Sequence, residues 1–275
     1  MRNSPKKIRP PSKLRSEPDH NFFTLVLAEM LHFEREFIPY IYKNLFSNNT
    51  VTEQVKNLLE AETKAAYLFA EIENQGLIKP GKTEHQLNND IFKLAFELFG
   101  IKKYWHKRIV RSGKNTLLPY KENPPNLTLQ PDDILFFDFG PVFDEWEADY
   151  GRTYVLGNNA QKLKLKADVA LAWQEGCGFY KDNKADLTGA DFYTYTKQLA
   201  LKYGWQYGNI HCGHLIGNFP HEIVLGEELI NYIHPENDQP MLAKDKFGND
   251  RHWIYEIHFI DTQEQIGGFF EQMMV

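Results

Sequence analysis

The chain has few cysteines, no excess of positive charge and no long apolar run. Only Cys177 and Cys212 are present among 275 residues, which is too few for a disulfide framework and is typical of a reducing cytoplasm. The net charge of −6 argues against a nucleic-acid-binding surface over the body of the protein. No segment approaches the roughly 20 apolar residues of a membrane-spanning helix. We therefore expect a soluble, cytoplasmic protein.

The beginning of the chain differs in composition from the rest. Residues 1–19 carry six Lys or Arg and four Pro, which predicts a flexible basic tail. Residues 20–50 have apolar side chains at helical spacing, which predicts an N-terminal helical extension. The apolar run FFTLVLA resembles part of a signal peptide, but it ends at Glu29 without a small-residue cleavage site. Residues 51–275 are expected to form one domain, because no linker interrupts them.

The order of predicted helices and strands repeats along this domain. Two helices are predicted first, and the second has a capping box of Thr83 and Gln86 at its start and Gly100 at its end. Strands follow, then two more helices, then strands again. The predicted segments are helices at 50–76, 83–100, 160–176 and 190–204, and strands at 104–112, 133–140, 149–157, 252–261 and 267–275. Two helices followed by strands, twice over, indicate an α+β fold with two like-ordered halves.

Two aspartates interrupt apolar strand patterns in the first half. The stretch DFGPVFDEWEADYGRTYVLG has Asp138 at the end of one predicted strand and Asp149 at the start of the next. If the chain reverses near Phe143 and Asp144, the two residues lie directly opposite each other with Cβ atoms about 5 Å apart, and their like charges repel. A cation between them would remove that repulsion. The simpler alternative is that one aspartate caps a turn in solvent.

Polar residues also stand in apolar surroundings in the second half. Glu256 lies within HWIYEIHFID, Glu271 within GGFFEQMMV, and His214 in the glycine-rich stretch HCGHLIGNFPHE. Each has a plain structural explanation, such as a solvent-facing strand position or a buried, hydrogen-bonded histidine. Together with the two aspartates, however, they amount to four carboxylates and one imidazole, a set that could hold two divalent ions. Such ligands favour Mn, Fe, Co, Zn or Mg over Cu.

These motifs resemble the pita-bread metallopeptidase superfamily, which includes methionine aminopeptidase, Xaa-Pro aminopeptidase, prolidase and creatinase. The similar segments are GLIKPGKTE, SGKNTLLPY, DDILFFDFGPVFDEWEADYGRTYVLG, CGHLIGNFPHE, WIYEIHF and GGFFEQ. The resemblance implies a pita-bread (creatinase/aminopeptidase) fold with two pseudo-repeated ααββ halves over residues 51–275. It also implies two divalent metal ions, such as Mn, Co, Fe or Zn. Their ligands would be Asp138, Asp149, His214, Glu256 and Glu271.

The same resemblance implies an aminopeptidase or Xaa-Pro-type peptidase that removes the N-terminal residue of a peptide by attack of a metal-bridging hydroxide. Glu256 would hold metal and accept the proton of the water, and His221 would hydrogen-bond the substrate carbonyl or the tetrahedral intermediate. The alternative is a non-peptidase, either a creatinase-like hydrolase of a small amide or a binding module. The expected partner is a peptide or small amide, not nucleic acid or a membrane. A homodimer is left open.

Two features depart from the family pattern. The peptidases usually have a histidine where SGKNTLLPY has Tyr120, and a tyrosine with a pKa near 10 does not act as an imidazolium at neutral pH. Either another histidine such as His106 or His211 replaces it, or the chemistry differs. We therefore expect Tyr120, His221, His211 and His106 to contact the substrate. In addition, prolidase-like members usually carry a folded domain before this one, and only about fifty residues precede it here.

Overall fold

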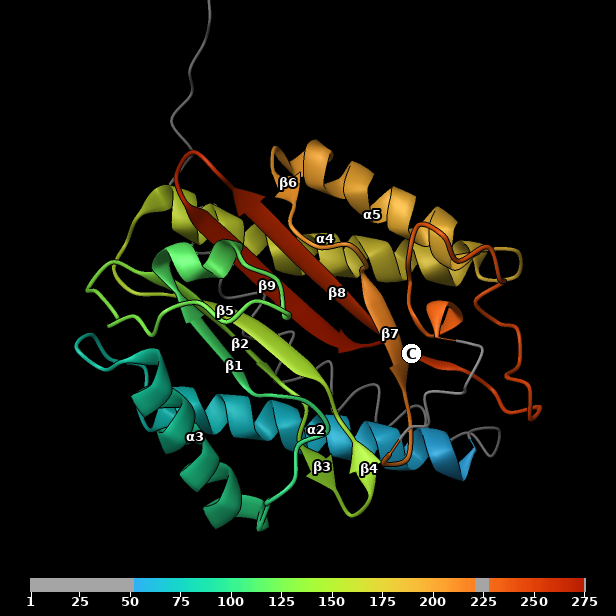
Figure 1. Ribbon diagram of the computed structural model, residues 1–275, viewed down its shortest axis with the longest axis horizontal. Coiled ribbons are helices and arrows are strands. Elements are labelled where there is room, and N and C mark those ends of the chain that lie inside the picture. Colours follow the sequence, from blue (N-terminus) through green and yellow to red (C-terminus); the bar gives the residue numbers. More distant parts are fainter. Residues whose placement is uncertain (1–51, 221–227, 275) are drawn as a thin grey trace, which may run out of the picture. The chain divides into compact units, whose positions relative to one another are not determined.

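The computed structural model describes residues 52–220 and 228–274 (Figure 1). The predicted basic tail at 1–19, the predicted helical extension at 20–50 and His221 lie outside the described residues. Within the described ranges, no helix is long and apolar enough to cross a membrane.

The first half begins with two helices whose ends agree with the sequence signals. Helix α2 spans Glu53–Asn74 and α3 spans Glu84–Phe99. Thr83 and Gln86 form the predicted capping box at the start of α3, and each satisfies a backbone N–H that the helix itself leaves without a partner. Gly100 ends α3 with a φ of 68°, a left-handed conformation that glycine adopts without steric cost.

The elements that follow confirm the predicted order. The strands are β1 (Ile109–Ser112), β2 (Ile134–Phe139), β3 (Val142–Phe143), β4 (Trp146–Glu147), β5 (Tyr150–Val155), β6 (Gln206–Tyr207), β7 (Gly213–Ile216), β8 (His252–Asp261) and β9 (Ile266–Met273). The later helices are α4 (Ala160–Asn183) and α5 (Gly189–Tyr203), and the 3-10 turns are η1 (Gly113–Leu117) and η2 (Leu229–Asn231). The strand predicted at 104–112 is shorter than expected, because only β1 pairs within the sheet.

One antiparallel sheet of seven strands joins the two halves. Its order is β1-β2-β5-β9-β8-β6, with β7 also paired to β8. The halves meet where β5 pairs with β9, and Gly151 lies opposite Glu271 there. In Figure 1, α2 and α3 lie near the strands of the first half, whereas α4 lies near β8 and β9, and α5 lies beside α4 and β6. The centre of the sheet is therefore built from both halves of the sequence.

The main apolar core lies under the first-half strands and sets the direction of Asp138. Phe69 of α2 makes edge-to-face contacts with Phe137 and Phe139 of β2, with ring centroids 6.1 and 5.6 Å apart. Side chains alternate along a strand, so Asp138 between them points to the other face of the sheet. The packing of the two phenylalanines on one face of the sheet thus directs this carboxylate to the opposite face.

The predicted direct opposition of Asp138 and Asp149 is wrong. Asp138 pairs with Gly151 across β2 and β5. The chain reverses at Asp144 and Glu145, which have φ values of 48° and 75°, and not one residue earlier as expected. Asp149 precedes Gly151 by two residues, so it is a diagonal neighbour of Asp138 on the same face of the sheet. The two carboxylates therefore still lie close together.

Candidate metal centre

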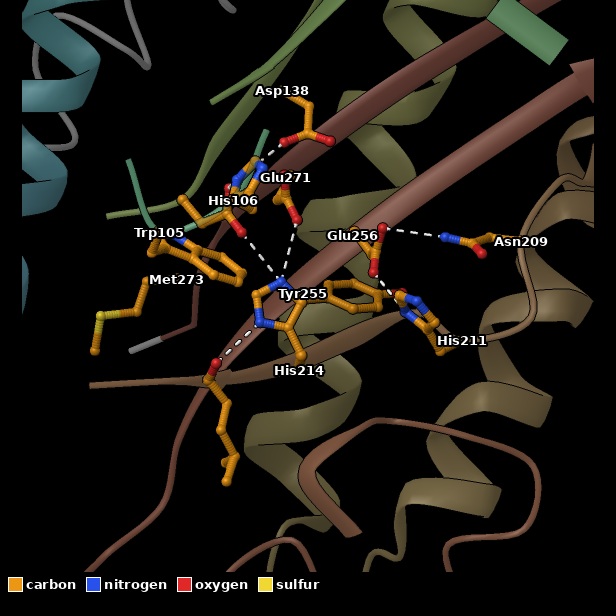
Figure 2. Close-up of polar contacts among 12 residues, drawn as sticks. Trp105, His106, Asp138, Asn209, His211, His214, Tyr255, Glu256, Glu271 and Met273 are labelled. Atoms are coloured by element: carbon orange, nitrogen blue, oxygen red, sulfur yellow. Dashed lines mark hydrogen bonds and ion pairs between the residues drawn. The ribbon is translucent and has the colours of Figure 1, made fainter. Parts of the chain in front are cut away.

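Four of the five predicted metal ligands gather near the middle of the sheet. Asp138 comes from β2, Asp149 from the residue before β5, His214 from β7 and Glu271 from β9. The three carboxylates are 8%, 1% and 3% exposed, and the His214 side chain is 12% exposed. A further histidine, His106, completes the group, and its side chain is 7% exposed. Five ionisable side chains from separate strands and loops thus lie close together. Figure 2 shows four of them, Asp138, His106, His214 and Glu271.

Asp149 lies between the two histidines. Its Oδ2 is 3.1 Å from Nε2 of His214, and its Oδ1 is 3.2 Å from Nε2 of His106. Nε2 of His214 is also 3.6 Å from Oε1 of Glu271, and Nε2 of His106 is 3.4 Å from Oδ1 of Asp138. The cluster therefore divides into two groups that share Asp149, namely His106–Asp138–Asp149 and Asp149–His214–Glu271. In each group, the three residues offer one ligand atom each, and these atoms lie within 4.8 Å of one another.

The buried carboxylates make the cluster suited to cations. Burial raises the pKa of Asp138 to about 7, although the charge of His106 opposes this change. Burial, together with the charges of Asp149 and Asp138, raises the pKa of Glu271 well above its usual range. Oε2 of Glu271 is buried and has no hydrogen-bond partner among the described residues. Because such an oxygen costs about 1–3 kcal/mol, a bound divalent ion would stabilise this arrangement, and the residues fit a metal centre.

Both histidines are held in the same orientation. Nδ1 of His106 lies 2.7 Å from the carbonyl oxygen of Lys107, and Nδ1 of His214 lies 2.9 Å from that of Leu215. A carbonyl oxygen only accepts, so Nδ1 carries hydrogen in each ring and Nε2 faces the carboxylates. Burial alone would lower the pKa of His106, but the charges of Asp149 and Asp138 outweigh it and raise the pKa to about 9.

The fifth predicted ligand, Glu256, has different partners. It lies on β8 directly opposite Glu271 of β9. Its Oε1 is 2.7 Å from Nδ1 of His211, and its Oε2 accepts a hydrogen bond of 3.3 Å from Nδ2 of Asn209. Figure 2 shows the Glu256 side chain turned toward these two residues. The structure therefore places Glu256 and His211 together beside the cluster, and Glu256 belongs to neither of its two groups of donor atoms.

Tyr120, which occupies the usual family histidine position, lies beside His106. Their ring centroids are 5.7 Å apart, and the Tyr120 hydroxyl accepts a hydrogen bond of 3.3 Å from the backbone N–H of Lys107. Tyr120 is 41% exposed, so it stands at the solvent side of the site. The two residues that were expected to share one role thus lie together, but only His106 reaches the carboxylates.

Two aromatic residues at the site were missed by sequence reasoning. The Trp105 ring lies 4.4 Å from the ring of His106 and 5.1 Å from that of His214. The Tyr232 ring lies 5.0 Å from that of His211, and Tyr232 is 40% exposed. Trp105 could have been suspected because it directly precedes His106. Tyr232 belongs to no recognisable motif, and only the tertiary structure brings it near the site.

Gly140 makes room for the Trp105–His106 pair. A Cβ atom at this position would overlap both rings. We expect Gly140→Ala to lower the free energy of unfolding by about 1–3 kcal/mol, because the rings must move to relieve the overlap. Urea unfolding of the metal-free protein would measure this effect.

A matched control is Gly178→Ala in α4, where a Cβ atom meets nothing within 4 Å. This change should be neutral or stabilising by up to ~1 kcal/mol, because alanine favours a helix more than glycine does. If the two variants were equally stable, the rings of Trp105 and His106 would not need the space that Gly140 leaves.

Known proteins with similar sequences and structures share this architecture. The chain is 27% identical over 183 residues to the Xaa-Pro dipeptidase of Lactobacillus helveticus, covering 65% of this chain and 48% of that protein. It is 26% identical over 251 residues to the Xaa-Pro dipeptidase of Lactobacillus delbrueckii subsp. lactis, covering 83% of this chain and 65% of the relative. The chain therefore spans between about half and two-thirds of the length of these relatives.

Solved structures give the same result for the fold. The X-Pro aminopeptidase from Thermotoga maritima MSB8 has a TM-score of 0.63 at 20% identity, over 80% of this chain and 57% of that chain. A dipeptidase from Pyrococcus horikoshii OT3 has a TM-score of 0.62 at 25% identity, over 81% and 57%. These neighbours confirm the predicted α+β pita-bread fold. Residues 56–269, which include Asp138, Asp149 and His214, match metallopeptidase family M24, and the chain belongs to that family.

Proposed function

We propose that this protein is a peptidase of the Xaa-Pro type that uses two divalent metal ions. The observation that carries the proposal is the position of Asp149 between His106 and His214, with Asp138 and Glu271 beside them. Membership of a metallopeptidase family and similarity to two Xaa-Pro dipeptidases support the choice of a peptide substrate. Hydrolysis of the bond between an N-terminal residue and proline is the reaction that follows.

The proposed ligands are the five residues that match the family motif, Asp138, Asp149, His214, Glu256 and Glu271. When bound, two divalent ions supply a Lewis acid for the scissile carbonyl and lower the pKa of water. Shared buried carboxylates such as Asp149 suit a pair of ions, since each oxygen of Asp149 faces a different histidine. The metals to be tested are Mn²⁺, Co²⁺, Fe²⁺ and Zn²⁺, all of which accept carboxylate and imidazole ligands.

Residues beside the cluster would move protons and orient the peptide. Glu256 is the proposed general base, and the hydrogen bond of 3.3 Å that its Oε2 accepts from Nδ2 of Asn209 orients its carboxylate. Burial raises the pKa of Tyr120, so its hydroxyl keeps its proton near neutral pH and can donate a hydrogen bond to the substrate. His221, as the second proposed catalytic residue, would donate to the carbonyl oxygen under attack. Tyr120 and Tyr232, each about 40% exposed, would line the entrance.

We also infer the organisation and location of the chain. Residues 51–275 are the proposed catalytic domain, preceded by the basic tail at 1–19 and the helical extension at 20–50. Two free thiols, Cys177 and Cys212, support a location in the cytoplasm. The proposed partner is a peptide, with no role for nucleic acid or a membrane, and a homodimer is a question for solution measurements.

Hydrolysis of a peptide panel tests the proposal. Metal-free protein would be loaded with each of the four ions and mixed with Xaa-Pro, Xaa-Pro-Xaa, Met-Xaa and N-acetylated peptides, with Asp138→Ala as the blank. We expect cleavage of free-amine peptides with proline in second place, and no cleavage of acetylated ones. Protein that binds two ions but cleaves no peptide would contradict the proposal and would favour a creatinase-like or binding role.

A further inference from the structure

We propose that His106 is a sixth metal ligand, so that each of the two ions is bound by one imidazole. The inference rests on the proposed dinuclear site and assigns to His106 a role that the five-residue family motif does not contain. It replaces the expectation that His106 contacts the substrate.

His106 and His214 have matching contacts. Each Nε2 faces one oxygen of Asp149, at 3.2 Å for His106 and 3.1 Å for His214. Each Nε2 also faces a second carboxylate, Asp138 at 3.4 Å and Glu271 at 3.6 Å. If the contacts of His214 are those of a metal ligand, the contacts of His106 satisfy the same description. Asp149 would then belong to both groups of ligands, each with one histidine and one further carboxylate, and Glu256 beside them would be the remaining ligand.

The imidazole ring of His106 is held in the state that a metal ligand requires. Nδ1 of His106 donates to the carbonyl oxygen of the next residue, Lys107, at 2.7 Å, as Nδ1 of His214 donates to Leu215 at 2.9 Å. This hydrogen bond fixes the proton on Nδ1 and leaves the lone pair of Nε2 for a cation. A metal-ligating histidine usually donates its second N–H to a carbonyl or carboxylate in this way. Without a cation, Nε2 of His106 must carry a proton to lie so close to two carboxylates.

The ring of His106 cannot readily turn toward the entrance. The side chain of His106 is 7% exposed and packs edge-on against Trp105. Trp105 is itself fixed, because its Nε1 donates to the carbonyl of Ala148 at 3.0 Å and its backbone N–H to that of Gly140 at 2.9 Å. A substrate-binding histidine would direct a nitrogen toward solvent. Both nitrogens of His106 are instead directed at protein groups.

A second imidazole also affects the choice of metal. Imidazole suits Zn²⁺, Fe²⁺ and Co²⁺, whereas sites made of carboxylates alone suit Mn²⁺ and Mg²⁺. We therefore expect His106→Gln to lower the affinity for Co²⁺ more than the affinity for Mn²⁺. This difference between two ions is not expected from a change that only loosens the fold, because loosening weakens both.

The test is proton NMR of the full-length protein titrated with Co²⁺. A histidine that binds paramagnetic Co²⁺ through Nε2 gives one exchangeable Nδ1–H resonance far outside the usual range. We expect two such resonances in the natural protein. His106→Gln should lose one of them, and His214→Gln should lose the other. A matched control is His85→Gln, the same change at an exposed histidine, which should keep both resonances. Equilibrium dialysis should show that His106→Gln binds its second Co²⁺ about 100-fold more weakly.

Three results would overturn the inference. If His106→Gln kept both resonances and the natural Co²⁺ affinity, His106 would not be a ligand, although the dinuclear site would stand. A single shifted resonance in the natural protein with two bound ions would lead to the same conclusion without any variant, should His106→Gln fail to fold. If the natural protein bound fewer than two ions and showed no shifted resonance, the proposed dinuclear function itself would fail.

Discussion

Replacing Asp149 with asparagine is expected to remove both metal ions and reduce peptide hydrolysis to background. Asp149 is the residue shared by the two groups of donor atoms, and it faces His106 with one oxygen and His214 with the other. Asparagine is neutral and presents an amide N–H₂ on one side, which cannot bind a cation. We expect the affinity for each ion to fall by more than ~100-fold. Metal analysis after dialysis, together with peptide hydrolysis, measures both effects.

A matched control for this variant is Asp132→Asn. The Asp132 side chain is 72% exposed and contacts Lys162 at the surface, so the same chemical change there should leave metal content and hydrolysis as in the natural protein. Circular dichroism would establish that both variants are folded. Asp149→Asn that retained two ions at natural affinity would show that the centre of the site lies elsewhere.

Removal of metal by a chelator is expected to lower the melting temperature by at least ~10 °C at neutral pH. An ion that binds only the folded protein stabilises it by ~4 kcal/mol when its free concentration is 1,000 times the dissociation constant. A domain of this size shifts by about 2–4 °C for each kcal/mol. Calorimetry with and without chelator, at a fixed concentration of Co²⁺, would measure the difference. Equal melting temperatures would contradict the proposed metal centre.

The metal-free protein should also become less stable as the pH rises from 5 to 9. Burial raises the pKa of Asp138 to about 7 in the folded protein. Its contribution to the free energy of unfolding is therefore complete below its usual pKa near 4 and is lost as the pH rises through 7. Burial also raises the pKa of Glu271, so this residue changes the stability of the protein in the same direction. The contribution of His106 is complete below 6.5 and is lost as the pH rises through about 9. The pKa of Asp149 is lowered, because the charge and hydrogen bond of His106 outweigh the effect of burial. Asp149 therefore has the opposite effect on stability, and only below pH 4.

The part of the pKa change of Asp138 that lies between pH 5 and pH 7, about two units, corresponds to ~3 kcal/mol, so Asp138 alone predicts a fall of about 5–10 °C between pH 5 and pH 8. Bound cations would neutralise the carboxylates, and the metal-loaded protein should lose much less stability over the same range. Melting curves of both forms at half-unit pH intervals test this difference. A metal-free protein whose stability rose toward pH 8 would show that the carboxylates are not buried together.

Local sequence signals accounted for the elements and for most of the side chains that cluster at the candidate metal centre. The capping box of Thr83 and Gln86 and the terminal Gly100 act over a few residues, and the structure has them as predicted. The repeated order of helices and strands was likewise readable, because amphipathic periodicity reflects which face each element buries. Asp138, Asp149, His214 and Glu271 stood out because ionisable groups are unfavourable inside apolar strands unless something compensates their charge. These four lie together in the structure.

Register and side-chain direction depended on the tertiary structure. The left-handed conformations of Asp144 and Glu145 set the turn so that Asp138 pairs with Gly151, which the spacing of the aspartates alone could not reveal. Glu256 could be assigned to a strand face, but its contact with His211 depends on a loop that arrives from elsewhere in the chain.

His106 illustrates the remaining limit of the sequence. Its residue type made it a candidate for the substrate site, yet its distance of 3.2 Å to Asp149 joins residues 43 positions apart. That contact depends on the packing of Trp105 against both histidines and on the space left by Gly140. A sequence determines which side chains are available and which strands they occupy. The direction in which a buried ring points is decided by every neighbour that packs against it, and those neighbours come together only in the folded chain.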